Sequence, residues 1–335
     1  MKKLAIVVPC YNEEEVFEDT KKELSKVLTS LKEKNKISSN SFLLFVDDGS
    51  SDKTWNLIEE AHKTSKNICG LKLVSNRGHQ NALFAGLMFA KDNADLSISI
   101  DADLQDDTKV IEEMVDKYNE GFDIVYGVRN DRTTDTFFKR TTANLFYKLM
   151  KALGSKAIEN SADFRLLSKR VLEELSLYEE YHLFLRGLVP SLGYKQTCVY
   201  YKRSPRLKGE SKYPFKKMLS FAFDGVTSFS DVPLNIILYL GFFSIIVSII
   251  SIIYSLIRHI QGNTIVGWTS LFISLWFIGG LILISLGVVG KYVGKAFIES
   301  KKRPRYYIET ILSYNKNGGK KKWLTKKLFA NLCFT

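Results

Sequence analysis

Hydrophobic and polar positions follow two different periods along the chain up to about Tyr201. Short apolar runs rich in β-branched or aromatic residues alternate with longer charged segments in which apolar residues recur every three or four positions. The short runs predict buried strands and the longer segments predict amphipathic helices. The predicted strands are Leu4–Val8, Phe42–Val46, Leu71–Val74, Leu96–Ile100 and Phe122–Gly127. The predicted helices are Glu13–Leu31, Thr54–His62, Asn81–Lys91 and Lys109–Tyr118.

This alternation of strands and helices predicts an α/β fold, in which helices cover both faces of a mostly parallel sheet. Ligands bind such sheets at the carboxyl ends of the strands. Four predicted strands end in polar turns, at 9–14, 47–52, 75–81 and 101–103. One such turn could merely cap a helix, but four on one edge predict a binding site. Neither a dinucleotide-binding GxGxxG nor a P-loop motif is present.

Asp101 and Asp103 are the centre of this predicted site. They follow a strand at positions i and i+2, which places two carboxylates on the same side of an extended segment. Like charges held so close repel unless a cation lies between them. Mg²⁺ or Mn²⁺ would bind oxygen ligands here and keep positions free for substrate phosphates. The alternative is a solvated acidic turn before a helix that begins near Thr108.

Two long apolar segments, Pro233–Ile257 and Ile265–Val289, predict a transmembrane hairpin. Each would be about 37 Å long as a helix, which is enough to cross a bilayer. Lysines and arginines gather before the first segment and after the second, whereas the connecting loop has only Arg258. This asymmetry predicts that both termini face the cytoplasm. Tyr213–Ser230 has apolar residues at helical spacing, which indicates an amphipathic helix at the membrane interface or against the catalytic domain.

The amino-acid composition limits the kinds of binding partner and of cellular compartment that fit this chain. The net charge of +12 alone would suit either nucleic acid or an anionic membrane, but the neighbouring apolar segments favour lipid and no nucleic acid. Four scattered cysteines without a CxxC motif predict a reducing compartment, with neither a disulfide framework nor a zinc site. The expected organisation is a catalytic domain at 1–212, an interfacial helix at 213–231, two spans within 232–290 and a basic cytoplasmic tail at 291–335.

Several motifs in fixed order resemble glycosyltransferase family 2, of GT-A fold. They are Val-Val-Pro-Cys-Tyr-Asn-Glu-Glu from Val7, Val-Asp-Asp-Gly-Ser-Ser-Asp-Lys-Thr from Val46 and Asp-Ala-Asp-Leu-Gln-Asp from Asp101. Within the family the chain most resembles polyprenyl-phosphate glycosyltransferases. These include dolichol-phosphate mannosyltransferase and bacterial enzymes that load glucose or amino sugars onto undecaprenyl phosphate. The resemblance covers residues 4–309 and includes Asn76–Gly86, Ser161–Leu166 and Arg206–Tyr213.

The resemblance implies a role for individual residues. Nucleotide-sugar contacts would come from Pro9, Tyr11, Glu13, Asp47, Asp48, Arg77, Gln80, Asp101 and Ala102. The divalent metal would be bound by Asp101, Asp103 and Gln105. The phosphates of donor and lipid would be bound by Arg129, Arg203, Arg206 and Lys212. These basic residues could instead form a solvated face.

Asp103 and Asp163 are the implied catalytic carboxylates. The role of Asp163 stays undecided: it could be a base, a positioning group or a structural partner of Arg165 or Arg170.

The implied reaction is inverting transfer of one sugar from a UDP-sugar to undecaprenyl phosphate at the cytoplasmic face of the plasma membrane, in service of cell-envelope glycans. Resembling proteins include homo-oligomers, so the oligomeric state stays open. One alternative is a processive polysaccharide synthase of the same family, but the expected Gln-x-x-Arg-Trp motif is absent from the sequence. Another is a non-catalytic two-span membrane partner, against which the intact acidic motifs argue.

Overall fold

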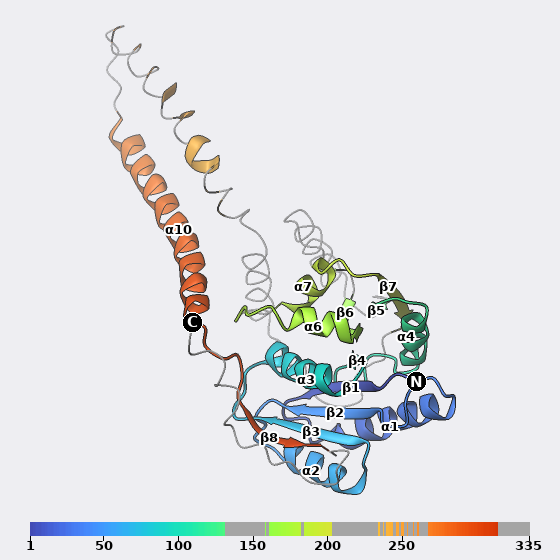
Figure 1. Ribbon diagram of the computed structural model, residues 1–335. Coiled ribbons are helices and arrows are strands. Elements are labelled where there is room, and N and C mark those ends of the chain that lie inside the picture. Colours follow the sequence, from blue (N-terminus) through green and yellow to red (C-terminus); the bar gives the residue numbers. More distant parts are fainter. Residues whose placement is uncertain are drawn as a thin grey trace, which may run out of the picture. The chain divides into compact units, whose positions relative to one another are not determined.

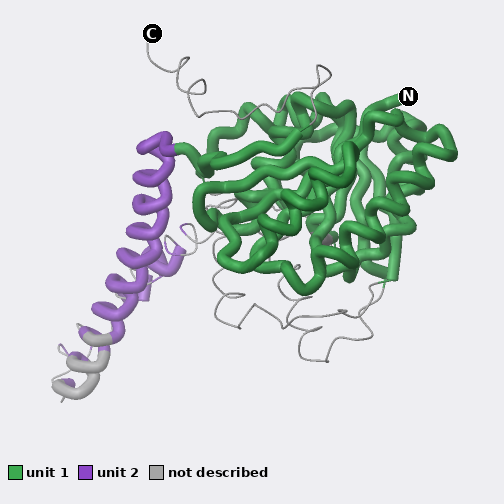
Figure 2. Tube along the Cα trace, turned by 90° about the horizontal axis from the view of Figure 1, so that it is seen from below, with its two compact units in different colours: residues 1–151, 156–215, 304–335 green, residues 152–155, 216–303 purple. Residues whose placement is uncertain are grey.

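The computed structural model describes residues 1–130, 158, 161–181, 184–202 and 267–313, together with scattered positions between 234 and 260. The chain divides into two compact units, coloured green and purple in Figure 2. The first unit contains Met1–Lys151, Lys156–Phe215 and Pro304–Thr335, and the second contains Ala152–Ser155 and Lys216–Arg303. The first unit therefore includes chain from both sides of the second.

An eight-stranded sheet forms the first unit, with the strand order β7-β5-β6-β4-β1-β2-β3-β8 (Figure 1). The strands are β1 (Leu4–Cys10), β2 (Phe42–Asp47), β3 (Ile68–Leu73), β4 (Leu96–Ser99), β5 (Ile124–Arg129), β6 (Ser161–Ser168), β7 (Gln196–Tyr201) and β8 (Ile308–Leu312). Within this described sheet, β6 and β8 run against the other strands. The prediction of a mostly parallel α/β sheet is confirmed.

Helices cover both faces of the sheet, because the strands are apolar on both sides. The helices are α1 (Phe17–Glu33), α2 (Thr54–Thr64), α3 (His79–Asn93), α4 (Val110–Asn119), α6 (Lys169–Leu175) and α7 (Leu185–Ser191). In Figure 1, α1 and α2 lie on the opposite face of the sheet from α3. A Cβ added to Gly86 of α3 would come 2.4 Å from a methyl of Val7. Glycine therefore lets α3 approach the centre of the sheet.

Three strands and two helices of this unit were not predicted, and β6 shows why. Asp163 and Arg165 point from β6 into the protein, where each is only 2% exposed. Charged residues inside a strand conceal its hydrophobic pattern, so the segment looks like a loop in sequence. β8 lies within 291–335, where a basic tail was expected, and pairs antiparallel with β3. The chain thus adds a strand to the sheet after its apolar helix.

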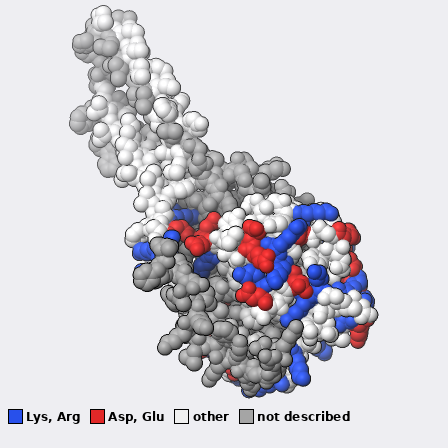
Figure 3. All heavy atoms as spheres, in the orientation of Figure 1, with Lys and Arg blue, Asp and Glu red and all other residues white. Residues whose placement is uncertain are grey.

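The second unit contains α10 (Trp268–Ser300), whose described surface carries almost no charge over most of its length (Figure 3). Its segment Phe277–Ser300 is long and apolar enough to cross a membrane. The predicted span of Ile265–Val289 overlaps this helix, which begins at Trp268 and continues through Lys291 and Lys295. Lysine is a good helix former, and the next proline is Pro304.

The other membrane predictions fall on residues that are mostly or wholly outside the described part of the chain. No residue of the predicted interfacial helix at 213–231 is described. In the loop predicted between the spans, at 258–264, only Ile260 is described. The first span, at 233–257, is described only at scattered positions. Among the described residues, one helix could cross a membrane. The two-helix hairpin therefore stays a prediction.

Candidate functional site

The acidic loop that follows β4 is fixed to the protein by its backbone. The carbonyl of Ala102 accepts a hydrogen bond of 2.6 Å from the Thr20 hydroxyl of α1. The backbone N–H of Gln105 donates to Asp103 Oδ1 at 3.2 Å. Leu104 has a φ of 52°, an uncommon conformation for a residue with a side chain. These contacts hold the carboxylates of Asp101 and Asp103 at the carboxyl edge of the sheet.

Asp101 lies in a crowded electrostatic environment. Burial raises the pKa of its carboxyl, the neighbouring His79 lowers it, and the charges of Asp163 and Asp106 raise it further. His79 Nε2 is 3.6 Å from Asp101 Oδ1 and 3.3 Å from Asp163 Oδ2. Burial disfavours the imidazolium, but its hydrogen bond to Asp163 and the charge of Asp101 raise the pKa of His79 to about 9. At neutral pH His79 is therefore a cation between two carboxylates.

The donor set around Asp101 suits a hard divalent cation. Within the described ranges, no group of three or more histidine, cysteine, aspartate or glutamate side chains is arranged to enclose a metal. Asp101 and Asp103 nevertheless offer carboxylate oxygens on one loop, and a cation beside them would offset the burial and the neighbouring negative charges that raise the pKa of Asp101. A pair of carboxylates fits an ion that takes its other ligands from water and phosphates.

Asp163 connects this edge to α7. Because β6 runs antiparallel to β4, its first residues return to the edge where β4 ends. The buried carboxylate of Asp163 accepts hydrogen bonds from Arg165, from Arg186 Nη2 at 3.0 Å and from Gln80 Nε2 at 3.2 Å. Burial alone would raise the pKa of Asp163, but Arg186, His79 and Arg165 hold it well below its usual range. Asp163 is thus ionised and heavily hydrogen-bonded.

The two aspartates that end β2 have different roles. Asp48 accepts hydrogen bonds from the backbone N–H groups of Arg77 at 2.7 Å and Gly78 at 2.9 Å, so it fixes the β3–α3 loop. Gly78 has a φ of 85°, which glycine adopts without strain. Asp47 Oδ1 accepts from the Ser50 N–H at 3.3 Å. Its other oxygen is buried without a hydrogen-bond partner in the described structure, which is uncommon for a carboxylate.

The turn after β1 supplies the remaining predicted nucleotide contacts. Pro9 is buried within β1, whereas Tyr11 is 40% exposed at the edge of the sheet. The backbone N–H of Glu13 donates to the Thr54 hydroxyl at 2.9 Å, which ties this turn to the start of α2. The turns after β1 and β2 therefore lie side by side, as the sequence predicted for parallel neighbours.

Arg129 is held inside the protein domain by an acidic partner. Its Nη2 lies 2.9 Å from Asp106 Oδ1, and Tyr201 donates a hydrogen bond of 2.5 Å to the same oxygen. Asp106 is 4% exposed, so this ion pair fixes β5 and β7 to the acidic loop. The other predicted phosphate ligands, Arg203, Arg206 and Lys212, lie outside the described residues.

Two residues of the site were not singled out from the sequence. His79 stands in the polar turn after β3, but no role was assigned to it. Arg186 is the only charged residue between His182 and Tyr194, and an isolated charge in an apolar run is a sign of a buried or functional partner. Its side chain is 42% exposed although it pairs with the buried Asp163. The side chain of Arg186 is therefore partly open to solvent at this edge.

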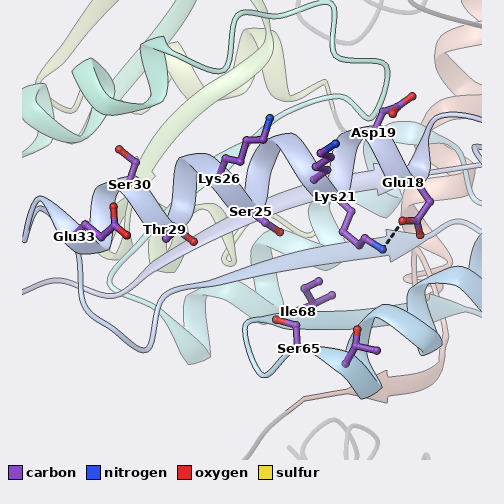
Figure 4. A pocket seen from close by; sticks show the side chains of 12 residues that line it. Glu18, Asp19, Lys21, Ser25, Lys26, Thr29, Ser30, Glu33, Ser65 and Ile68 are labelled. Carbon is purple, nitrogen blue, oxygen red and sulfur yellow. Dashed lines mark ion pairs between the residues drawn. The ribbon is translucent and has the colours of Figure 1, made fainter.

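A groove of about 840 Å³ lies elsewhere, along α1 and beside the end of α2 (Figure 4). Its walls carry interspersed basic and acidic side chains, including Lys21 and Glu18, which form an ion pair at 2.5 Å. None of the predicted site residues lines it. The groove therefore offers no chemistry that competes with the carboxyl edge.

The family model and the curated relatives identify one family. Residues 5–176 match Glycosyl transferase family 2. The uncharacterized glycosyltransferase YkoT of Bacillus subtilis (strain 168) is 54% identical over 93% of this chain and 92% of its own. The bactoprenol glucosyl transferase of Shigella phage SfV is 38% identical over 92% of this chain and 98% of its own. Among solved structures, glucosyl-3-phosphoglycerate synthase from Mycobacterium tuberculosis with Mn²⁺, UDP and phosphoglyceric acid is 17% identical over 68% of this chain and 76% of its own, with a TM-score of 0.43.

Proposed function

Because the chain belongs to glycosyltransferase family 2, we propose that it transfers a single sugar from a nucleotide-diphosphate sugar to a polyprenyl phosphate. The relative from Shigella phage SfV is named a bactoprenol glucosyl transferase and is similar over 92% of this chain. We further propose a UDP-sugar as donor and undecaprenyl phosphate as acceptor. The observation that carries this proposal is the carboxylate pair of Asp101 and Asp103 at the carboxyl edge, beside the ionised network of Asp163.

The nucleoside of the donor would bind over the turns after β1 and β2. Tyr11 offers an exposed ring there, and the unpartnered oxygen of Asp47 offers a buried acceptor for an N–H or O–H group of the donor. Asp48 would act through the loop that it holds, since both of its oxygens already accept backbone hydrogen bonds. Arg77 and Gln80 lie on or just after that loop and would face the donor diphosphate.

Asp101 and Asp103, with Gln105, would hold Mg²⁺ or Mn²⁺ against the diphosphate. The cation would neutralise the charge that develops on the leaving UDP. The imidazolium of His79 lies between Asp101 and Asp163, so it would help to keep the Asp101 carboxylate in place. The fixed backbone of Ala102 would keep this loop from moving as charge develops.

The acceptor phosphate would need no general base, because it is already largely ionised near pH 7. We therefore propose that Asp163 positions other groups rather than removing a proton. Its low pKa makes it a poor base, and its oxygens are engaged by His79, Arg186 and Gln80. The exposed part of Arg186 would attract the acceptor phosphate. Direct attack of that phosphate on the anomeric carbon inverts the configuration, so an α-linked donor gives a β-linked product.

Dependence of UDP release on the lipid acceptor tests this proposal. The purified full-length protein in detergent, with Mn²⁺ and a UDP-sugar, is expected to release UDP at least about tenfold faster when undecaprenyl phosphate is added. Release that is equally fast without lipid phosphate would contradict the acceptor assignment. A processive synthase would release UDP continuously while it makes polymer, and a non-catalytic membrane protein would release none under either condition.

We also propose that the protein is embedded in the plasma membrane with the catalytic domain and both termini in the cytoplasm. Phe277–Ser300 is apolar enough to cross a bilayer, and Lys301, Lys302 and Arg303 follow it directly. Basic residues next to a span favour the cytoplasmic side. The variant Asn263→Cys is therefore expected to react with a membrane-impermeant thiol reagent in intact cells. Labelling only in broken cells would contradict this topology, and reporters fused at either terminus should report cytoplasm.

A further inference from the structure

The chain that follows the apolar helix is built into the catalytic sheet. After α10 ends at Ser300, residues 301–304 lead into Arg305, Tyr306 and Tyr307, and then into β8. The carbonyl of Tyr307 accepts a hydrogen bond of 3.0 Å from the N–H of Val74, which extends the β3–β8 ladder by one residue. We call residues 305–307 the strap.

The first two residues of the strap contact helix α3, which carries site residues, and the chain at Tyr178. The Arg305 guanidinium lies 4.5 Å from the ring centre of Phe84 in α3 and donates a hydrogen bond to the carbonyl of Tyr178. Arg305 is only 9% exposed, so these contacts are largely shielded from water. The ring of Tyr306 lies 6.5 Å from that of Phe84 in an edge-to-face arrangement. The helix that receives both contacts begins at His79.

Tyr307 reaches the loop before that helix. The guanidinium carbon of Arg77 lies 5.7 Å from the centre of the Tyr307 ring. The backbone N–H of the same arginine is held by Asp48 at 2.7 Å. The main chain of Arg77 is therefore held by Asp48, which follows β2, and its guanidinium lies beside an aromatic ring of the strap. An arginine side chain that is held before binding loses less conformational entropy when a ligand arrives.

We propose that Tyr307 is a positioning residue for donor binding, because its ring holds the Arg77 guanidinium in place for the donor diphosphate. The inference rests on the proposed function, since it takes the ligand to be a nucleoside diphosphate. It also makes the chain beyond α10 part of the nucleotide site, although that chain is separated from Arg77 by more than two hundred residues of sequence. A cation over an aromatic ring requires the ring and not the phenol hydroxyl.

The test measures UDP binding by calorimetry to the full-length protein in detergent with Mn²⁺. Tyr307→Leu removes the ring and is expected to raise the dissociation constant of UDP about two- to fivefold, the size of one exposed cation–π contact. Tyr307→Phe keeps the ring and should bind like the wild type. Glu309→Ala is the matched control, because Glu309 lies two residues further along, in β8, and forms an ion pair with Lys72 at 3.1 Å near the surface. It should leave UDP binding unchanged.

A double-mutant cycle separates positioning from general damage to the strand. In the Arg77→Met background, Tyr307→Leu should cause no further loss of UDP affinity, because the group that it positions is gone. An equal loss in both backgrounds would overturn the inference, as would a Tyr307→Phe variant that binds as weakly as Tyr307→Leu. A wild-type chain that binds no UDP would contradict the proposed donor, and this inference with it.

Discussion

Replacing either Asp101 or Asp103 by asparagine is expected to lower the turnover number about a thousandfold or more, while the protein stays folded. A metal and its carboxylate ligands stabilise the leaving diphosphate by several kcal/mol in the transition state, and each roughly 1.4 kcal/mol corresponds to a factor of ten. Asparagine keeps the shape of aspartate, and its oxygen can still accept the hydrogen bond that Gln105 donates to Asp103. The substitutions would therefore lower the turnover number and leave the protein folded.

The measurement is UDP release at saturating donor over a range of Mg²⁺ and Mn²⁺ concentrations, with the thermal midpoint as a check of folding. Asp107→Asn is the matched control from the same loop. Asp107 accepts a 3.0 Å hydrogen bond from the N–H of Lys109 just before α4, and the side-chain oxygen of asparagine can accept the same bond. Its turnover should stay within about twofold of wild type. Near-normal turnover in both the Asp101→Asn and Asp103→Asn proteins would contradict the metal assignment.

Asp163→Asn is expected to have the second largest effect, on both stability and turnover. Removing the charge leaves Arg165 without its buried counterion and takes one of two neighbouring carboxylates from His79, and breaking such a buried pair typically costs about 3–5 kcal/mol of unfolding free energy. Turnover per folded molecule should fall about a hundredfold, since small displacements of positioned groups can have effects of that size. Asp123→Asn is the control, because it weakens the ion pair with Arg170 outside the site and should lower stability alone.

The difference in unfolding free energy between the wild type and Asp163→Asn should become smaller as the pH falls into the acid range. The pKa of Asp163 is lower in the folded protein than the value of about 3.9 for an unfolded chain, so its stabilising contribution is complete above that value. The contribution is lost as the pH falls towards the folded pKa. Urea midpoints should therefore differ by a constant amount between about pH 5 and 6, where His79 is charged in the folded chain, and converge below about pH 4. A difference that grew towards acid would contradict the assignment of Asp163 as a strongly ionised group.

The carboxyl edge could be predicted because its parts are local in sequence. β1 and β2 are almost continuous apolar runs, β3 is interrupted by Lys72 and β4 alternates with serines, and each strand is followed within a few residues by the polar group that it presents. Asp163 could not be placed in this way, since its partners come from β6, α3 and α7. The sequence left Arg165 or Arg170 as its structural partner. The structure pairs Asp163 with Arg165 and Arg186, and places Arg170 against Asp123.

The strap and β8 could not be predicted for a related reason. An edge strand of five residues has little hydrophobic pattern of its own, and β8 follows a run of lysines and arginines that looks like a solvated tail. Its place in the sheet depends on pairing with β3, and the Lys72–Glu309 ion pair joins residues separated by 237 positions. Local periodicity carries no information on such pairs. Arg77 was predicted as a nucleotide contact, but the aromatic ring that holds it was not.

The most direct test of the proposed reaction is the chemical identity of its product. The purified protein would be incubated with Mn²⁺, undecaprenyl phosphate and each of a panel of UDP-sugars, beginning with UDP-glucose. Mass spectrometry and anomeric NMR of the lipid fraction should then reveal one sugar on the lipid monophosphate, joined through a β linkage when the donor is α-linked. An α-linked product, or sugar found on a growing glycan instead of the lipid monophosphate, would contradict the account.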